Sequence, residues 1–111
     1  MLAWQVLRVR GRSMMPTLPD GSLVLLRRGA TPRPGEVVVV RLPGGRPDAV
    51  KRAVRREAAG WWVERDNPRE GVDSWNVGAI STADVHGVVR LRLWPWPSPV
   101  RQRAGGGRSA V

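Results

Sequence analysis

The chain has 111 residues, 41% of them hydrophobic, and a formal net charge of +10. This length and composition predict one small domain with one core, and the absence of cysteine excludes disulfides, thiolate metal sites and cysteine nucleophiles. No apolar run approaches the ~20 residues of a membrane-spanning helix, so we expect a cytoplasmic protein without a stable membrane anchor.

The first predicted strand covers residues 2–10, where apolar and polar residues partly alternate. It leads into the stretch 10–18, Arg-Gly-Arg-Ser-Met-Met-Pro-Thr-Leu, which places Ser13 in a turn. Pro16 excludes an ordinary continuing helix or central strand at this point. A Pro-Asp-Gly-Ser turn then precedes a short apolar strand over 23–26.

Two further strands are predicted in the middle of the chain. Residues 36–42 contain four consecutive valines, which is typical of a strand buried on both faces. In the next strand, over 48–55, the two-residue period places Ala49, Lys51 and Ala53 on one face. The small neighbours of Lys51 leave room above it, as a base that faces a substrate requires.

Lys51 is the only lysine among 19 basic residues, and the other 18 are arginines. Arginine cannot be deprotonated in a protein, whereas a desolvated lysine can, so this position indicates a need for a neutral amine. A neutral lysine can serve as the base for a serine nucleophile. We therefore predict that Ser13 and Lys51 are catalytic. The alternative is a solvent-facing lysine on an edge strand.

The second half of the chain continues with a strand over 60–64, a loop over 65–79 and a last strand over 87–94. The alternation in the last strand places three apolar residues on one face: Val89, Leu91 and Leu93. Residues 100–111 have no pattern able to fold alone, so we expect a folded domain over 1–99 and a disordered tail. Short strands and turns with hardly any helical period predict an all-β, twisted and partly closed sheet.

Four motifs stand in an order that resembles the type I signal peptidase family over roughly residues 6–97. They are Gly11-x-Ser13-Met14-x-Pro16-Thr17-Leu18, Asp20-Gly21, Val50-Lys51-Arg52, and Asp66-Asn67 followed by Asp73-Ser74. The resemblance implies a twisted β-fold in which the serine and the lysine face each other across a groove. It also implies peptide hydrolysis that needs no cofactor and no metal, with the Ser13 amide as an oxyanion donor.

The chain departs from the family pattern at Arg65 and Pro68, where glycine and arginine are common, and at three further positions. Gly71 stands where a serine often orients the lysine, and Trp75 stands where an arginine usually pairs with the aspartate. We therefore expect Asp73 and Ser74 to form a supporting loop, in which Asp73 pairs with another arginine or binds the loop backbone. Gly11 replaces a residue that often supplies a hydroxyl, so a second oxyanion donor has to be a backbone amide, with that of Gly11 as the candidate, or a group that the sequence does not indicate.

Three residues beside the nucleophile, Met14, Met15 and Pro16, are predicted to contribute to the substrate pocket. The two methionines and the surrounding valines could also form the apolar wall that desolvates Lys51, and for at least one methionine ordinary core packing is the favoured role.

The resemblance implies a soluble endopeptidase that removes a short leader from a precursor protein or peptide, cutting after a small residue. Among short relatives without an anchor, the chain resembles the maturation proteases of nickel-type superoxide dismutase. One alternative is a LexA-like self-cleaving regulator, which shares the Gly-x-Ser-Met motif but needs a scissile segment before the serine. The other is a non-enzymatic basic β-module that binds nucleic acid, which the scattered arginines disfavour.

Overall fold

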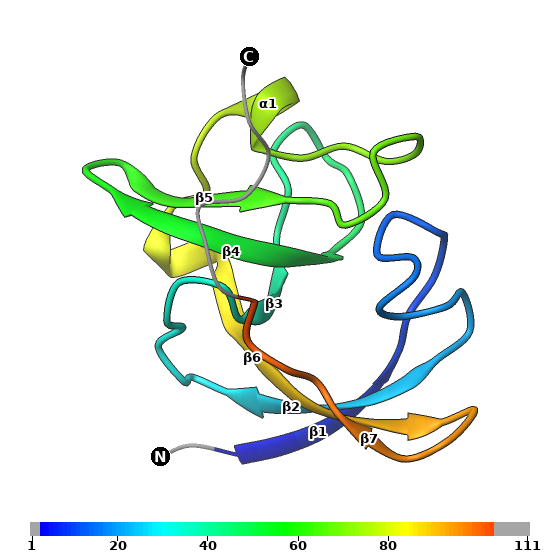
Figure 1. Cartoon of the computed structure of the whole chain (residues 1–111). Helices are drawn as coiled ribbons and strands as arrows, with labels where there is room; N and C mark the ends of the chain where they lie inside the picture. Colours follow the sequence, from blue (N-terminus) through cyan, green and yellow to red (C-terminus); the bar gives the residue numbers. More distant parts are fainter. Residues whose placement is uncertain (1–2, 104–111) are drawn as a thin grey trace.

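Seven strands make up most of the regular structure in the computed structural model, which describes residues 3–103 (Figure 1). They are β1 (Ala3–Arg8), β2 (Leu23–Arg28), β3 (Val37–Val40), β4 (Ala49–Glu57), β5 (Gly60–Glu64), β6 (Val85–Trp94) and β7 (Ser98–Pro99). All pair antiparallel, in the order β1-β2-β6-β3-β4-β5, with β7 added to β6. The predicted all-β class is confirmed, and the sheet does not close.

No helix within residues 3–103 combines the length and the apolar character that crossing a membrane requires.

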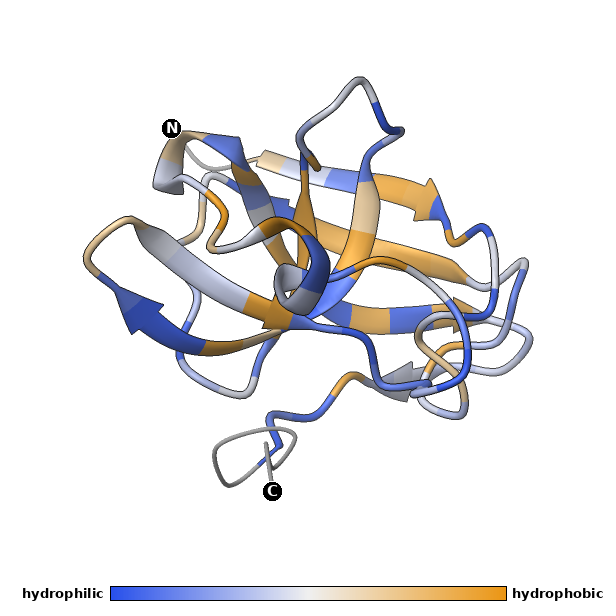
Figure 2. Cartoon of the chain, turned by 90° about the horizontal axis from the view of Figure 1, so that it is seen from above, coloured by the Kyte–Doolittle hydropathy of each residue, from blue (hydrophilic) through white to orange (hydrophobic). Residues whose placement is uncertain are grey.

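The sheet is bent into two arms joined by β3 and β6 (Figure 1). One arm holds β1, β2 and β7, and the other holds β4 and β5. Figure 2 shows hydrophobic residues along the central strands and hydrophilic residues in many of the outer loops. The valines of β3 alternate between two hydrophobic clusters: Val37 and Val39 belong to one, Val38 and Val40 to the other. This confirms the prediction that the valine strand is buried on both faces.

The last strand differs from its prediction, because Val89 and Leu91 lie on opposite faces. Leu26 pairs with Val89, whereas the neighbouring Leu25 pairs with Leu91, so Arg90 is the extra residue of a β-bulge. Val89 is buried in the core, while Leu91 is 38% exposed. A bulge inserts one residue into a two-residue period, and it therefore reverses the faces of the residues that follow it, up to the second register shift at Leu93.

Ordered structure also occurs where the sequence predicts only loop or tail. The 65–79 loop contains a four-residue helix, α1 (Ser74–Val77), and a short 3-10 helix (Thr82–Asp84) precedes β6. After β7, Val100 donates a backbone hydrogen bond to Arg90 over 2.9 Å, and Arg103 donates one to Gly35, also over 2.9 Å. The order therefore extends past Pro99, and the rest of the predicted tail, 104–111, lies outside the described residues.

Candidate active site

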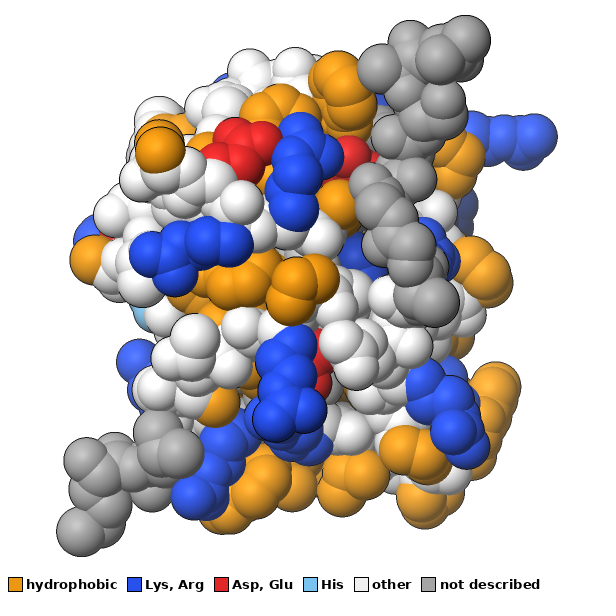
Figure 3. Space-filling view, turned by 60° about the vertical axis from the view of Figure 1, so that its left-hand side comes forward, with side chains coloured by type: hydrophobic (Ala, Val, Ile, Leu, Met, Phe, Trp, Pro, Cys, Tyr) orange, Lys and Arg blue, Asp and Glu red, His pale blue; other side chains and the backbone are white. Residues whose placement is uncertain are grey.

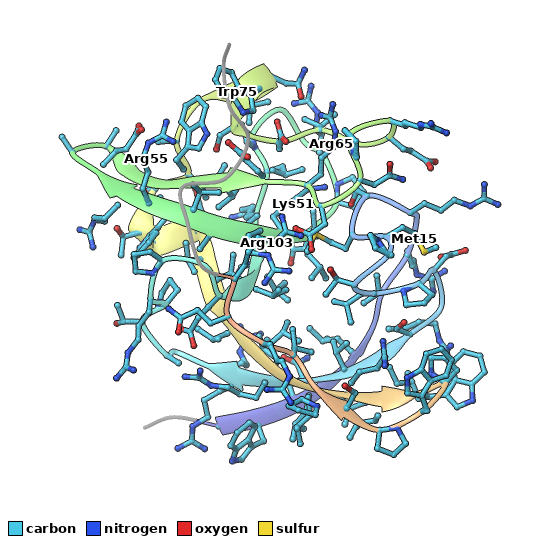
Figure 4. The ribbon with its side chains drawn as sticks, in the orientation of Figure 1. Met15, Lys51, Arg55, Arg65, Trp75 and Arg103 are labelled. Atoms are coloured by element: carbon cyan, nitrogen blue, oxygen red, sulfur yellow. The ribbon has the colours of Figure 1, made fainter. Side chains whose placement is uncertain are left out.

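The two predicted catalytic side chains meet between the arms of the sheet. Lys51 is the third residue of β4, and its Nζ is 2.9 Å from the Oγ of Ser13, which is 38 positions earlier in the turn after β1. Figure 4 shows Lys51 between β4 and the loop that carries Met15. Lys51 is only 3% exposed, and β4 lies between β3 and β5. These observations contradict the alternative of a solvent-facing lysine on an edge strand.

The surroundings of Lys51 favour its neutral form. Burial lowers the pKa of Lys51 from 10.5 to about 8, with an opposing effect from Asp73 and a smaller lowering effect from Arg65. Within residues 3–103, its ammonium forms no salt bridge, and its one hydrogen-bond partner is the hydroxyl of Ser13. A lysine in this environment carries a useful neutral fraction near neutral pH, as a general base requires.

Asn67 holds the turn that carries the nucleophile. Its backbone N–H donates to the Ser13 carbonyl over 2.8 Å, and its side-chain Nδ2 donates to the Arg12 carbonyl over 2.9 Å. The peptide groups on both sides of Ser13 are thereby fixed by one residue of the 65–79 loop. The Asp66-Asn67 motif thus acts on the nucleophile through the backbone rather than through a charged contact.

The neighbouring Asp66 anchors this loop to β4. Its Oδ2 is 2.6 Å from Nη2 of Arg52, and the two side chains are 1% and 5% exposed. Arg52 also donates to the Gly35 carbonyl over 2.9 Å and to the Arg101 carbonyl over 3.0 Å. Adjacent strand residues point to opposite faces, so Lys51 contacts the nucleophile while Arg52 braces the loop that positions it.

Arg65 organises the remainder of the 65–79 loop. Its Nη1 donates to the Gly71 carbonyl over 3.0 Å and lies 3.7 Å from Asp73 Oδ2, and its Nε donates to the Asn67 carbonyl over 3.0 Å. Figure 4 shows Arg65 above Lys51, where the chain leaves β5. Arg65 is thus the arginine partner of Asp73, in place of the arginine that Trp75 replaces. Sequence reasoning did not assign this role to Arg65.

Asp73 and Ser74 support the loop through the backbone. Asp73 accepts hydrogen bonds from the N–H of Arg65 and of Trp75, each over 3.0 Å, and so caps α1. The Ser74 hydroxyl accepts from the Val63 N–H over 2.9 Å and ties the helix to β5. Both expected modes for Asp73, an arginine partner and local backbone bonds, are present together.

Gly71 brings the loop backbone directly against the pair. A Cβ at this position would lie 2.6 Å from Ser13 Cβ and 3.5 Å from Lys51 Nζ, and φ is +106°. A side chain here would therefore both strain the backbone and displace the nucleophile. The contact of the loop backbone with Ser13 explains why a serine, or any residue with a Cβ, does not fit at this position.

A cavity of about 590 Å³ opens beside Ser13 and Lys51. Its apolar wall comes from the end of β1, the β3–β4 connection, β4 and the 65–79 loop: Val9, Leu42, Ala49, Val50 and Val72. The predicted pocket residues Met14, Met15 and Pro16 are not among the residues that line this cavity. Met14 is 1% exposed because it turns inward and packs in the core below the nucleophile.

Gly11 lines this cavity but does not offer a free donor. Its N–H, predicted as an oxyanion donor, already donates to Asp20 Oδ1 over 2.8 Å. The N–H of Ser13 donates no hydrogen bond within residues 3–103. Of the two predicted backbone donors, only the Ser13 amide is left to meet an oxyanion.

The family model described as Peptidase S24-like matches residues 3–90. This match covers most of the chain and includes Ser13, Lys51 and the whole 65–79 loop. A comparison with curated proteins finds no match.

Proposed function

Because the chain belongs to the Peptidase S24-like family, a family of serine peptidases, we propose that it is a serine endopeptidase with Ser13 as nucleophile and Lys51 as general base. The observation that carries this proposal is the 2.9 Å contact between the Ser13 hydroxyl and a lysine that is only 3% exposed. A buried lysine that forms no salt bridge within residues 3–103 is costly to keep charged, and its proposed function requires the neutral form.

In the proposed reaction, neutral Lys51 accepts the proton of Ser13 Oγ while this oxygen attacks the scissile carbonyl. The oxyanion of the tetrahedral intermediate accepts a hydrogen bond from the Ser13 N–H. The Lys51 ammonium then gives its proton to the leaving amine, and an acyl-enzyme on Ser13 remains. Lys51, neutral again, activates the water that hydrolyses this ester.

The cavity supports a substrate with a small residue before the cut. Val9, Ala49, Val50 and Val72 are short apolar residues, and they leave an apolar space beside the nucleophile. An apolar site gives modest affinity for a small apolar side chain, and the limit on its size comes from the resemblance to the signal peptidase family. We propose that the substrate is an extended leader segment of a precursor protein, cut after alanine or a residue of similar size.

The finer proposal is that this precursor is a nickel-type superoxide dismutase. It rests on the resemblance of the Ser13 and Lys51 motifs to those of the corresponding maturation proteases. Removal of a leader would release a terminal amine, and an amine can bind nickel in a way that an amide does not. The substrate is therefore consistent with the proposed chemistry.

The test is incubation with such a precursor followed by intact-mass analysis, with a Ser13→Ala variant as the matched control. We expect one cut after a small residue, and no cut by the variant. A peptide library with Ala, Leu or Phe before the cut tests the endopeptidase activity separately from the identity of the precursor. Cleavage in the library without cleavage of the precursor would reject the substrate alone, and cleavage that persists in Ser13→Ala would reject the assigned nucleophile.

A LexA-like self-cleaving regulator is the second candidate, because the Gly11-x-Ser13-Met14 motif and the Peptidase S24-like match are compatible with it. Self-cleavage within one molecule has a rate that is independent of protein concentration. Incubation of the chain alone at several concentrations, followed by mass analysis, distinguishes it from cleavage of a separate substrate.

A further inference from the structure

Charged side chains, as well as apolar ones, line the cavity beside Ser13 and Lys51. Four of them are arginines: Arg8, Arg10, Arg12 and Arg46. Two are carboxylates, Asp48 and Glu70, and all six of these residues are exposed. The apolar wall accounts for one small side chain of a substrate, whereas these exposed groups are placed to contact the residues beside it.

The four cavity arginines have no acidic partner within residues 3–103. Five other arginines in this part of the chain form salt bridges, and none of these five lines the cavity: Arg52, Arg55, Arg65, Arg90 and Arg103. Asp48 lies 3.1 Å from His86 Nε2 instead, and Glu70 forms no salt bridge in the same part of the chain. The cavity therefore has an excess of positive charge that is not held in ion pairs.

Positive charge alone does not mark a site in a chain with a net charge of +10. Figure 3 shows basic side chains over much of one face of the molecule, with acidic side chains beside only some of them. The cavity differs because its unpaired arginines line a concave space next to a nucleophile. A cleft lined mainly by one sign of charge focuses the electric field and raises the local concentration of an oppositely charged substrate.

Two of the four arginines have their guanidinium groups fully available. Arg8 and Arg46 each donate through Nη1 to a backbone carbonyl, over 2.8 Å and 2.7 Å. The side chains of Arg10 and Arg12 form no hydrogen bond or salt bridge within residues 3–103. A guanidinium has five N–H donors and can bind a carboxylate with two of them at once. Arg10 and Arg12 are therefore the strongest candidates for contact with a carboxylate of the substrate.

The position of these two arginines limits where that carboxylate can lie. Arg12 directly precedes Ser13, and its carbonyl accepts a hydrogen bond from Asn67 Nδ2 over 2.9 Å, which fixes the backbone that carries it. Arg10 is two positions earlier and lines the same cavity. An extended peptide advances ~3.3 Å per residue, so a carboxylate bound here belongs to a residue within about three positions of the cut.

From this arrangement we propose that the cavity selects peptides with an acidic residue within about three positions of the cut, and that Arg10 and Arg12 bind its carboxylate. The inference rests on the proposed peptidase function and adds a charge requirement to it. A lysine or arginine of the substrate at the same position would be repelled. Nucleic acid is disfavoured as the anionic ligand, because tryptophan is the only aromatic residue type in the chain and no tryptophan lines the cavity, so bases lack a stacking surface.

The experiment is cleavage of matched peptides by the full chain. Each peptide has Ala before the cut, and a single Asp is moved through the other positions within three residues of it. Asn replaces Asp in the control peptides, because it has the same shape without the charge, and Lys replaces it in a third set. At one position or more we expect kcat/KM to be about tenfold higher for Asp than for Asn, as for hydrogen bonds to a charged group, and lowest for Lys. Added salt should reduce the difference.

Two charge reversals give a matched comparison. Arg12→Glu changes a residue that lines the cavity, and Arg33→Glu changes one that does not, although both are exposed and neither side chain has a salt bridge within residues 3–103. Both variants change the net charge equally. We expect Arg12→Glu to abolish the preference for Asp and to favour the Lys peptide over the Asp peptide, and Arg33→Glu to keep the wild-type order. Arg10→Glu is the second variant if Arg12→Glu lowers the melting temperature.

Binding of the same peptides to the Ser13→Ala variant tests the proposal without cleavage, and we expect about tenfold tighter binding of the Asp peptide than of the Asn peptide. Equal affinity and equal kcat/KM for Asp and Asn at every position would overturn the proposal and leave the peptidase function intact. Tighter Asp binding without cleavage of any peptide would support the proposal and count against the peptidase function. A preference for Asp that survives both Arg12→Glu and Arg10→Glu would overturn the assigned residues. A single-stranded oligonucleotide that blocks the Asp and Asn peptides equally, with no preference between them, would overturn the proposal in favour of nucleic acid.

Discussion

The two faces of β4 each bury a cationic side chain, but the two side chains have different kinds of polar partner. On one side, Arg52 is 4% exposed and lies 2.6 Å from a carboxylate that is itself almost fully buried, Asp66. On the other side, the adjacent Lys51 is 3% exposed, and its hydrogen-bond partner is the neutral hydroxyl of Ser13. Two successive residues with similar burial thus have an ion pair in one case and a nucleophile in the other.

The difference shows how one strand separates structural support from chemistry. The arginine side keeps its charge and uses it to hold Asp66 and the Asn67 clamp on the nucleophile turn. On the other face, burial lowers the pKa of Lys51 to about 8. Arginine suits the first role because its charge is permanent, and lysine suits the second because its charge is not. The predictions below test this division.

The largest effect on stability is expected from Arg52→Leu. Asp66 would remain buried with only the half-exposed Arg103, 3.4 Å from its Oδ1, as a cationic partner, and loss of the buried partner of an ion pair typically costs about 3–5 kcal/mol. The control is Arg55→Leu, since the Arg55–Glu57 pair has side chains that are 47% and 34% exposed, and such pairs contribute about 0–1 kcal/mol. Denaturant unfolding compares the two. Equal losses would contradict the account of the arginine side.

The opposite sign is expected for Lys51→Met. The pKa of Lys51 is lowered in the fold from 10.5 to about 8, so below pH 8 the unfolded chain binds this proton more tightly than the native one. Removal of the amine should raise the free energy of unfolding at pH 7 by about 3 kcal/mol. The gain should fall as the pH rises from 8 to 10.5 and vanish above that. A gain that does not depend on pH would show that lysine burial is not its cause.

Gly71→Ala should lower the cleavage rate, and it should affect the free energy of unfolding less than Arg52→Leu does. Its Cβ would lie 2.6 Å from Ser13 Cβ, and misplacement of a nucleophile by about 1 Å can cost roughly 10²-fold in rate. The matched control is Gly78→Ala, which also has positive φ but no heavy atom within 4 Å of a new Cβ. Similar rates in the two variants would show that the loop gives way and does not position Ser13.

The smallest expected effect is the pH dependence of the wild-type enzyme. With a Lys51 pKa of about 8, kcat/KM should rise about tenfold between about pH 7 and pH 9 as the neutral fraction grows. Asp73 raises the pKa of Lys51, so Asp73→Asn should move the inflection to lower pH. A flat profile, or a shift to higher pH in Asp73→Asn, would contradict the assigned base.

The strands and the pair itself could be predicted from the sequence because their signals are local. Alternation and the valine run indicated the strands, and a lone lysine in an arginine-rich chain indicated Lys51. The bulge at Arg90 has no local signal, because the register is decided by pairing with β2. The four residues of α1 are too few to show a helical period. Its capping pattern, Asp73 with Asn76, was the available signal.

The parts of the site that the sequence did not indicate come from long-range contacts. Val9, Leu42 and Val72 form the cavity wall although each belongs to a different segment of the chain. The role of Arg65 depends on a loop path that returns to Asp73. Met14 was assigned to the pocket because it follows Ser13, but a turn sends neighbouring side chains in different directions, and Met14 is in the core.

The central claim, that Lys51 is the base for Ser13, is tested most directly by exchanging the two cations of β4 one at a time. Lys51→Arg keeps a charge but cannot accept the Ser13 proton, so kcat/KM should fall at least ~10²-fold in a folded protein. Arg52→Lys keeps a cation beside Asp66 and should retain cleavage within about tenfold of wild type. Near-normal cleavage by Lys51→Arg would contradict the serine–lysine mechanism.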